Sequence, residues 1–300
     1  MDKKKILLKE IEEKIKNFDK EKLISFLTAV SAVSAMRYSV TNQMLIAASC
    51  GNSFPGVVMG YKSWQKYGHR VKKGERGIAI LAPVRIKKQE TVTDPDTGEE
   101  KVIEVEKTFF KTVYVFTEAQ TVIVDPELDK KIPRPHFLKG DAEELYKKAK
   151  DIIKKEVSVI EEEIPDRYTG GYTDGEAIFI KKDLPTKHKF HTLIHEYTHY
   201  IKNHVNNPDK TENEIVAETS ALTCLKEFGI DSSEYSIEYI VAWMQEAKSI
   251  LKFLKEGIAT GEKIAQKIKE EVNNDRRSVN VSNRGTGGRR RCNSSIGTRT

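Results

Sequence analysis

Cysteine is scarce in this chain, and long apolar runs are missing from it. The three cysteines, Cys50, Cys224 and Cys292, are odd in number and far apart. This spacing favours neither a disulfide framework nor a cysteine-based metal site, and it is typical of a reducing compartment. The sequence has no stretch of 18 apolar residues and no apolar leader segment. We therefore expect a cytoplasmic protein with no membrane partner.

Acidic residues are absent from residues 276–300, which hold seven arginines. The net charge of the chain is +6, but without this segment it has 44 basic and 45 acidic residues. The segment is rich in Arg, Ser, Asn, Thr and Gly, and it has almost no apolar side chains. Such a composition predicts a basic disordered tail.

Prolines lie close together at only one place, where Pro126, Pro133 and Pro135 follow one another. Proline resists regular structure and spaces its neighbours, so we place a domain boundary near residue 132. The predicted domains are residues 1–132 and 133–275. Both combine helices with strands, which predicts an α+β fold. The second domain is expected to be mostly helical with a small antiparallel sheet.

Apolar periodicity predicts the main elements. In the first domain we expect a helix over 3–36 and strands at 74–88 and 108–116, joined by an exposed hairpin. In the second we expect a helix over 140–156, with Asp141 as its N-cap, and a strand pair at 168–180. Further helices are predicted from Pro185, over 212–228 with a stop at Gly229, and within 234–271.

The HExxH pattern at residues 195–199 is the strongest chemical signature in the chain. His195 and His199 are four residues apart, so on a helix both imidazoles face one way and can share one zinc ion. Glu196 can reach a water held by that ion, as the general base of HExxH peptidases does. The alternative is a solvated histidine pair. An apolar stripe on the same segment indicates partial burial, which is costly for unpaired ionisable groups.

A pair of acids follows on the next predicted helix. Glu214 and Glu218 lie on one face, so one can supply a third ligand while the other orients a ligating histidine. We favour Glu214 as the ligand and Glu218 as the orienting residue or alternative ligand. Thr211 with Glu214 also fits a capping box, whereas a helix that begins at Pro208 leaves Glu214 free to bind. The predicted cofactor is one zinc ion per chain, with manganese or another divalent metal as alternatives.

Two other histidines lie near the motif. His191 precedes His195 by one turn, and we expect it at the surface. His204 follows His199 by five residues, whereas a metzincin ligand would follow by six with a glycine between. We therefore assign neither as a metal ligand.

Residues 37–88 hold ten Lys or Arg and one acid, Glu75, with aromatic rings interleaved. Cations that follow phosphates and rings that stack on bases are the two components of single-strand binding. The alternative is a solvated basic face with the aromatic rings in the core, and at least one of Trp64 and Tyr67 is expected there. The candidate DNA contacts are Arg37, Tyr38, Asn42, Tyr61, Lys62, Trp64, Arg70, Lys72, Lys73 and Arg76.

Four short motifs lie in the first half, at Tyr38–Ile46, Gly60–Trp64, Gly68–Ile78 and Tyr114–Phe116. They resemble the N-terminal single-stranded-DNA-binding domain of ArdC-type antirestriction proteins. The second half, through the HExxH motif, Glu214 and Glu218, resembles the zincin domain of these proteins, which is related to ImmA/IrrE metallopeptidases. The resemblance spans about residues 1–255. It implies a protein of conjugative plasmids or transposons that shields incoming DNA from restriction. The acidic arm at residues 90–107, the short connection between the two metal motifs and the Arg-rich tail depart from the family pattern.

Two functions follow as hypotheses. In the first, the protein binds single-stranded DNA and is a zinc-dependent peptidase that acts on an unidentified protein substrate. In the second, it only coats incoming DNA, and the metal site is structural. Glu196 favours the first, because a structural zinc site needs no general base and is usually closed by four protein ligands.

Overall fold

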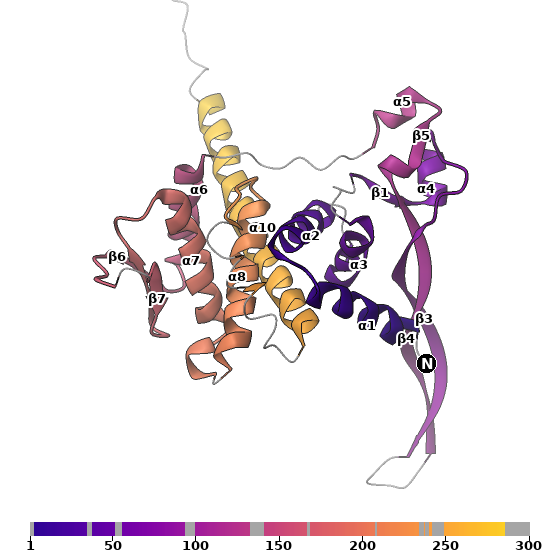
Figure 1. Cartoon of the computed structure of the whole chain (residues 1–300), viewed down its shortest axis with the longest axis horizontal. Helices are drawn as coiled ribbons and strands as arrows, with labels where there is room; N and C mark the ends of the chain where they lie inside the picture. Colours follow the sequence, from indigo (N-terminus) through magenta and orange to yellow (C-terminus); the bar gives the residue numbers. More distant parts are fainter. Residues whose placement is uncertain are drawn as a thin grey trace, which may run out of the picture.

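A computed structural model describes residues 3–34, 38–51, 56–93, 100–132, 141–166, 169–207, 209–233, 237, 240–241 and 249–285, the last of these as backbone alone beyond residue 273. Within these residues the chain is a mixture of helices and small sheets, so the predicted α+β class is confirmed. Figure 1 shows the N-terminal helices between a long β-hairpin and a mostly helical C-terminal part.

The N-terminal part begins with helices α1 (Lys3–Lys16), α2 (Lys20–Ser34) and α3 (Val40–Cys50). The single helix predicted over 3–36 is therefore two. Asp19 explains the break, because its side chain accepts a hydrogen bond from the backbone N–H of Lys22, at 2.8 Å, near the start of α2.

The predicted hairpin is present and long. Strands β3 (Ile78–Thr93) and β4 (Glu100–Thr117) pair antiparallel, and β1 (Val58–Gly60) pairs with the other edge of β4. The arm extends well away from the helices (Figure 1). Its turn at 94–99 lies outside the described residues.

A small unit stands at the base of this arm. It consists of α4 (Tyr61–Lys66), β2 (His69–Val71), η1 (Glu118–Gln120), β5 (Thr121–Ile123) and α5 (Pro126–Asp129). Val57, Trp64 and Ile132 form its core. The predicted linker thus begins with a short helix, α5, capped by Asp125; residues 133–140 lie outside the described residues.

The C-terminal part opens with α6 (Ala142–Ile153), whose predicted N-cap Asp141 is confirmed. Three short strands follow, β6 (Ser158–Glu162), β7 (Gly171–Thr173) and β8 (Ala177–Lys181), in the order β6-β8-β7. The predicted strand pair is β7 with β8. These two strands pair antiparallel as expected, but the sheet is mixed, because β6, which the sequence pattern did not indicate, pairs parallel with β8.

Helices α7 (Thr186–Ile201), α8 (Lys210–Lys226) and α10 (Ile250–Gly285) complete the fold, with the short η2 (His204–Asn206) between α7 and α8. Gly229 has a φ of +71° just after α8, as its predicted role as a stop requires. None of the described helices is both long and apolar enough to cross a membrane.

The prediction of disorder from residue 276 is wrong for residues 276–285, which continue α10. Adding a turn to a formed helix costs less than starting a new one, so the packed part of α10 supports the extension. Residues 286–300 lie outside the described residues.

The main hydrophobic core contains side chains from both sides of residue 132. Leu23 of α2 and Met44 of α3 share it with Leu222 of α8 and Leu254 of α10. A second core joins α6, α7, α8 and α10 over the β6-β8-β7 sheet. Helices α8 and α10 therefore contribute to both cores, and this fixes α8 against α7 at the site described next.

Candidate metal centre and basic surface

Helix α7 carries the HExxH motif on a largely buried segment. Phe190, Leu193 and Ile194 are fully buried, so they hold one face of α7 against the second core. The opposite face turns His195 and His199 toward α8. The helix is thus anchored by its apolar side, and the two imidazoles are presented on the other.

The two histidines and Glu214 meet at one point. The Nε2 atoms of His195 and His199 are 3.0 Å apart. The Glu214 carboxylate oxygens lie 3.3 Å from His195 Nε2 and 3.5 Å from His199 Nε2. Ligands at zinc bond lengths of about 2.0–2.1 Å in a tetrahedron are about 3.3 Å apart, so this set fits a divalent ion. The three residues therefore form a candidate metal site.

The start of α8 decides between the two interpretations of Glu214. Asp209 is the N-cap residue and Lys210 the first helical residue, so Glu214 lies in the helix interior. Its carboxylate is not used as a cap, and it faces the two imidazoles. The capping box with Thr211 is therefore absent.

Each ligating imidazole has an outer partner at its other nitrogen. Glu218 Oε1 lies 3.3 Å from His195 Nδ1, as expected of an orienting carboxylate. His204 Nδ1 lies 3.0 Å from His199 Nδ1, so His204 belongs to the site without being a ligand. The sequence spacing argued against a metzincin ligand at His204 but gave no sign of this contact with His199.

The expectation that His191 lies at the surface is wrong. The residue is 4% exposed, and its Nε2 lies 3.0 Å from Glu218 Oε2. It faces α8 because it is one turn before His195 on the same side of α7. The i, i+4 spacing could have suggested this, but sequence alone did not show that α8 covers that turn.

Burial and charge act against each other in this cluster. Burial opposes a charge on His195, yet Glu218 and Glu214 outweigh it and raise the pKa of the ring. Burial also opposes ionisation of Glu214, but hydrogen bonds from His195 and His199 lower its pKa to about 2. Glu196 has a raised pKa because it is buried. Glu214 is thus held in its ionised form beside the two imidazoles, while burial shifts Glu196 toward its neutral form.

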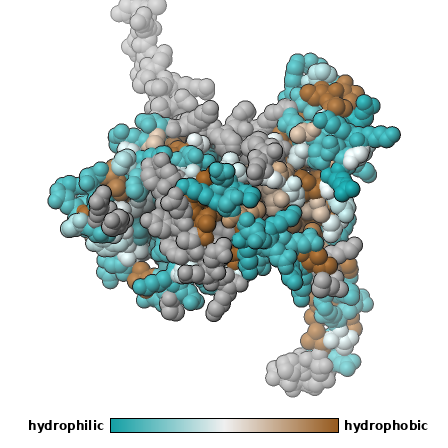
Figure 2. Space-filling model, in the orientation of Figure 1, coloured by the Kyte–Doolittle hydropathy of each residue, from teal (hydrophilic) through white to brown (hydrophobic). Residues whose placement is uncertain are grey.

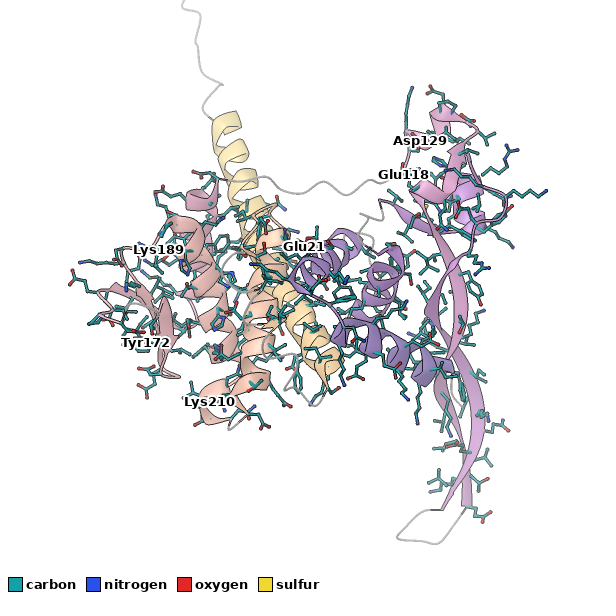
Figure 3. All side chains as sticks on the ribbon, in the orientation of Figure 1. Glu21, Glu118, Asp129, Tyr172, Lys189 and Lys210 are labelled. Carbon is teal, nitrogen blue, oxygen red and sulfur yellow. The ribbon has the colours of Figure 1, made fainter. Side chains whose placement is uncertain are left out.

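An open cleft of about 360 Å³ lies over the cluster. One wall is β7 with Gly171, Tyr172 and Thr173, and the other includes Lys210 at the start of α8. Figure 3 shows Tyr172 and Lys210 on this side of the molecule. Gly171 allows strand β7 to lie close to helix α7, because a Cβ at this position would come within 2.6 Å of Thr192 Cγ2. Glu196 also lines the cleft.

Several residues proposed to contact DNA are used by the fold instead. Trp64 is fully buried, and its indole N–H donates to the Phe116 carbonyl. Asn42 is buried and bonds to both backbone groups of Leu81. Tyr38 is half-buried, with its hydroxyl donating to Val58 O. Trp64 and Asn42 are therefore withdrawn as DNA contacts, and Arg37 lies outside the described residues.

The remaining candidates lie at the surface. Tyr61 is 48% exposed. The exposed cations Lys62, Arg70, Lys72, Lys73 and Arg76 occupy α4, β2 and the segment after it. Lys72 also donates to the Ala119 carbonyl, at 2.8 Å.

An apolar patch that the sequence pattern did not indicate lies beside these cations. Val122, Ile123 and Val124 are exposed on and just after β5, and Val122 pairs with Arg70 across the two-stranded β2-β5 sheet. Figure 2 shows apolar surface among hydrophilic surface in the region where Figure 1 places β5. The three consecutive valine and isoleucine residues were the available signal.

Comparison with known proteins matches the N-terminal part to a family model. Residues 5–116 match the family model of the N-terminal domain of anti-restriction factor ArdC. The match confirms the resemblance to ArdC-type proteins that the sequence shows in this part of the chain. No curated protein matches the chain.

Two solved structures of the antirestriction ArdC protein from the R388 plasmid are similar to it. The metal-free structure is 18% identical, with a TM-score of 0.42 over 79% of this chain and 86% of that chain. The Mn(II)-bound structure is 15% identical, with a TM-score of 0.46 over 84% of this chain and 98% of that chain.

Proposed function

We propose that this chain is an antirestriction-type protein that binds single-stranded DNA and carries a metal-dependent peptidase site. The observation that supports the peptidase most is the convergence of His195, His199 and Glu214 beside Glu196 in an open cleft. The matched family model supports the antirestriction role. The cations and the exposed ring around Tyr61 support the DNA role.

Two imidazole nitrogens and one carboxylate oxygen are the donor set of hydrolytic zinc sites, which leave a fourth position open. We therefore propose zinc as the ion, while manganese, which the R388 protein binds in one of its structures, is the alternative. When bound, the ion would polarise a peptide carbonyl and make water more acidic.

Glu196 supplies the proton transfers. It is 8% exposed and lines the cleft, so its carboxylate is sheltered but accessible to a substrate. It takes a proton from water as that water attacks the peptide carbonyl, and then gives the proton to the leaving amine. Its pKa is raised by burial, which favours the protonated form that gives the proton to the leaving amine.

Strand β7 is the proposed support for the substrate backbone. It lines the cleft and is an edge strand of the β6-β8-β7 sheet, whereas β8 is paired on both sides. A peptide in extended form can add to the free edge of β7 by backbone hydrogen bonds. The strand that precedes the HExxH helix, at residues 177–181, therefore lies behind β7 and not at the cleft.

The alternative is a DNA-coating protein whose metal site only stabilises the fold. Two observations favour the enzyme. Among the described residues the candidate site has three protein ligands where a closed structural site would have four, and Glu196, which is not a ligand in this geometry, lines the cleft beside them. A purely structural site has no use for either feature.

The decisive experiment measures metal content and hydrolysis together in the full chain. We expect one zinc ion per chain, lost in His199→Ala but kept in Glu196→Gln, because only the first removes a ligand. A mixed casein or peptide-library substrate should be cleaved by the unaltered protein and not by Glu196→Gln. Full metal occupancy in His199→Ala would refute the site, and equal cleavage by Glu196→Gln would refute the role of the base.

A further inference from the structure

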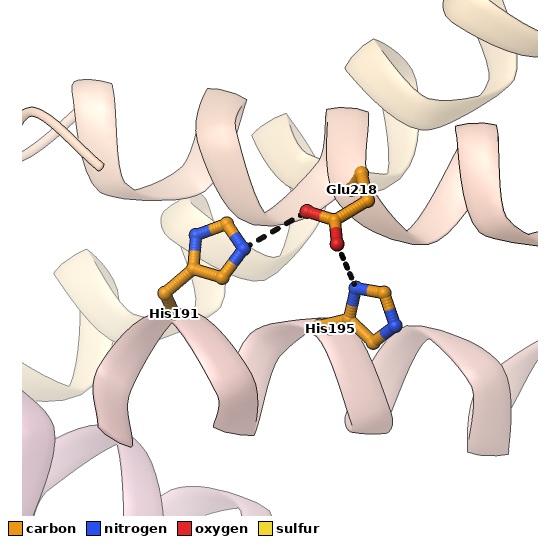
Figure 4. A group of neighbouring side chains, drawn as sticks. All are labelled: His191, His195 and Glu218. Carbon is orange, nitrogen blue, oxygen red and sulfur yellow. Dashed lines mark hydrogen bonds and ion pairs between the residues drawn. The ribbon is translucent and has the colours of Figure 1, made fainter. Parts of the chain in front are cut away.

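Behind the proposed ligands lies a buried chain of polar side chains. Ser232 Oγ is 3.1 Å from His191 Nδ1, and His191 Nε2 is 3.0 Å from Glu218 Oε2. The other oxygen of Glu218 lies 3.3 Å from His195 Nδ1. Figure 4 shows Glu218 bridging the two rings, with one oxygen toward each. This row of contacts thus connects Ser232, which follows α8, through His191 of α7 and Glu218 of α8 to His195, a ligand of the proposed metal.

We propose that His191 is a positioning residue: it fixes the Glu218 carboxylate, which in turn fixes the ring of His195 for metal binding. This inference rests on the proposed metal site. It assigns a role to a residue of α7 that binds neither the metal nor the substrate.

The hydrogen bond between His191 and Glu218 matters because both side chains are buried and have little access to water as a substitute partner. Ser232 is fully buried, and His191 and Glu218 are 4% and 8% exposed. A buried carboxylate with only one partner would be free to rotate or would need another donor. With Nε2–H of His191 on one oxygen, the second oxygen is aimed at His195 Nδ1. His195 then keeps a proton on Nδ1 and leaves Nε2 free for the metal.

The ligand atoms of His191, His195 and Glu218 also lie within 4.8 Å of one another, which raises the question of a second metal site. The geometry favours the hydrogen-bonded chain. The two histidines use different oxygens of Glu218, and their ring centroids are 6.5 Å apart, against 4.7 Å for His195 and His199. The proposed metal site has two Nε2 atoms that face each other, whereas this group has a carboxylate between its rings (Figure 4).

Two substitutions separate the two ring contacts of His191. In His191→Gln the amide nitrogen can take the place of Nε2 and still donate to Glu218. In His191→Asn the amide reaches only as far as Nδ1, so the hydrogen bond to Glu218 is removed while a polar group remains. Both variants carry a neutral amide, so they differ only in whether that amide extends far enough to donate to Glu218.

His69 provides a matched control. It is 3% exposed, and its Nε2 lies 2.7 Å from Asp129 Oδ1, so it forms a histidine–carboxylate pair with an equally buried ring and a somewhat more exposed carboxylate. It belongs to the small unit with α4 and α5. Figure 3 shows Asp129 at the opposite end of the molecule from Tyr172, which lines the cleft. His69→Asn therefore reports the general cost of removing such a pair.

The experiment titrates the full chain with Co²⁺, whose visible spectrum reports the coordination geometry, and repeats it with Zn²⁺ against a chelator. We expect His191→Asn to weaken metal affinity 10- to 100-fold, the usual effect of removing an outer partner. The metal affinity of His191→Gln should stay within a few-fold of that of the unaltered protein, and the affinity of His69→Asn should equal that of the unaltered protein. Melting of the metal-free proteins is measured alongside.

A double-mutant cycle gives the second measurement. If His191 acts through Glu218, then adding His191→Asn to Glu218→Ala should cause no further loss of affinity. Unaltered affinity in folded His191→Asn, equal losses in the Asn and Gln variants, or additive losses in the cycle would each overturn the inference. If His191→Asn is unfolded, His191→Leu, which has no donor for Glu218, replaces it in the affinity measurement and in the cycle with Glu218→Ala, and the same outcomes overturn the inference. Absence of metal binding by the unaltered protein would instead refute the proposed function.

Discussion

His199 and His204 face each other through their Nδ1 atoms, 3.0 Å apart. One of the two nitrogens must carry the proton that they share. Burial lowers the pKa of His204 to about 4, so His204 is neutral at pH 7 and can accept. His199 then donates from Nδ1 and leaves Nε2 for the metal. The structure thus gives each ligating histidine its own acceptor.

We predict that His204→Leu weakens zinc binding about tenfold, because the proton on His199 Nδ1 loses its acceptor. His204→Asn should retain most of the affinity, since its side-chain oxygen can accept the same hydrogen bond. Competition with a chelating dye measures both. Equal affinity in the Leu variant would show that the pair has no influence on the ligand.

Replacement of the two acids of α8, Glu214 and Glu218, should affect zinc binding in different ways. Glu214→Ala removes a ligand, so we expect no zinc to remain after gel filtration. Glu218→Ala removes only an outer partner, and zinc should still bind in a one-to-one ratio, but 10- to 100-fold more weakly. Glu212→Ala, in the first turn of the same helix, is the control. Reversed behaviour of Glu214 and Glu218 would exchange their roles.

Tyr61 and Trp64 should affect the protein in different ways. Tyr61 is exposed among cations, so Tyr61→Ala should weaken binding to a labelled single-stranded oligonucleotide by about 1–3 kcal/mol, with little change in melting. Trp64 is fully buried, so Trp64→Ala should destabilise the fold by about 3–5 kcal/mol. A normal affinity in folded Tyr61→Ala would remove this ring from the DNA surface.

The contribution of the exposed cations should appear in the salt dependence of single-strand binding. Replacing Lys73 and Arg70 by Ala should weaken single-strand binding. The slope of log affinity against log salt should fall by about 0.7 for each phosphate that no longer has a cation beside it. Tyr61→Ala should leave that slope nearly unchanged. A salt titration of the full chain distinguishes the two, and an unchanged slope in the double variant would place the DNA surface elsewhere.

Glu262 on α10 should make stability depend on pH. Burial raises its pKa to about 7, and among the described residues its Oε1 has no hydrogen-bond partner. Between pH 4.5 and 7 the folded protein therefore binds more protons than the unfolded chain, so this group makes stability fall as pH rises through that window. Glu262→Gln should remove this fall and add on the order of 1 kcal/mol at about pH 8. Parallel urea melts of both proteins at about pH 5 and pH 8 test it.

The chemistry of the site was largely determined by local sequence. Helical spacing alone predicted that His195 and His199 share a face and that Glu214 and Glu218 share another. The apolar stripe of the motif indicated burial, and the cap at Asp141 and the stop at Gly229 followed from single residues. These features depend on neighbours within a turn or two of chain, which is the range over which a sequence can be interpreted directly.

Packing between distant segments decided the rest. Only the meeting of α7 with α8 buried His191 against Glu218, and only the fold around Phe116 and Leu81 turned Trp64 and Asn42 inward. The parallel pairing of β6 with β8 and the core that joins α2 and α3 to α8 and α10 have the same origin. Hydrophobic burial is not directional and acts between residues however far apart they are in the chain. The periodicity of one segment therefore shows that it has a buried face, but not which other segment covers that face.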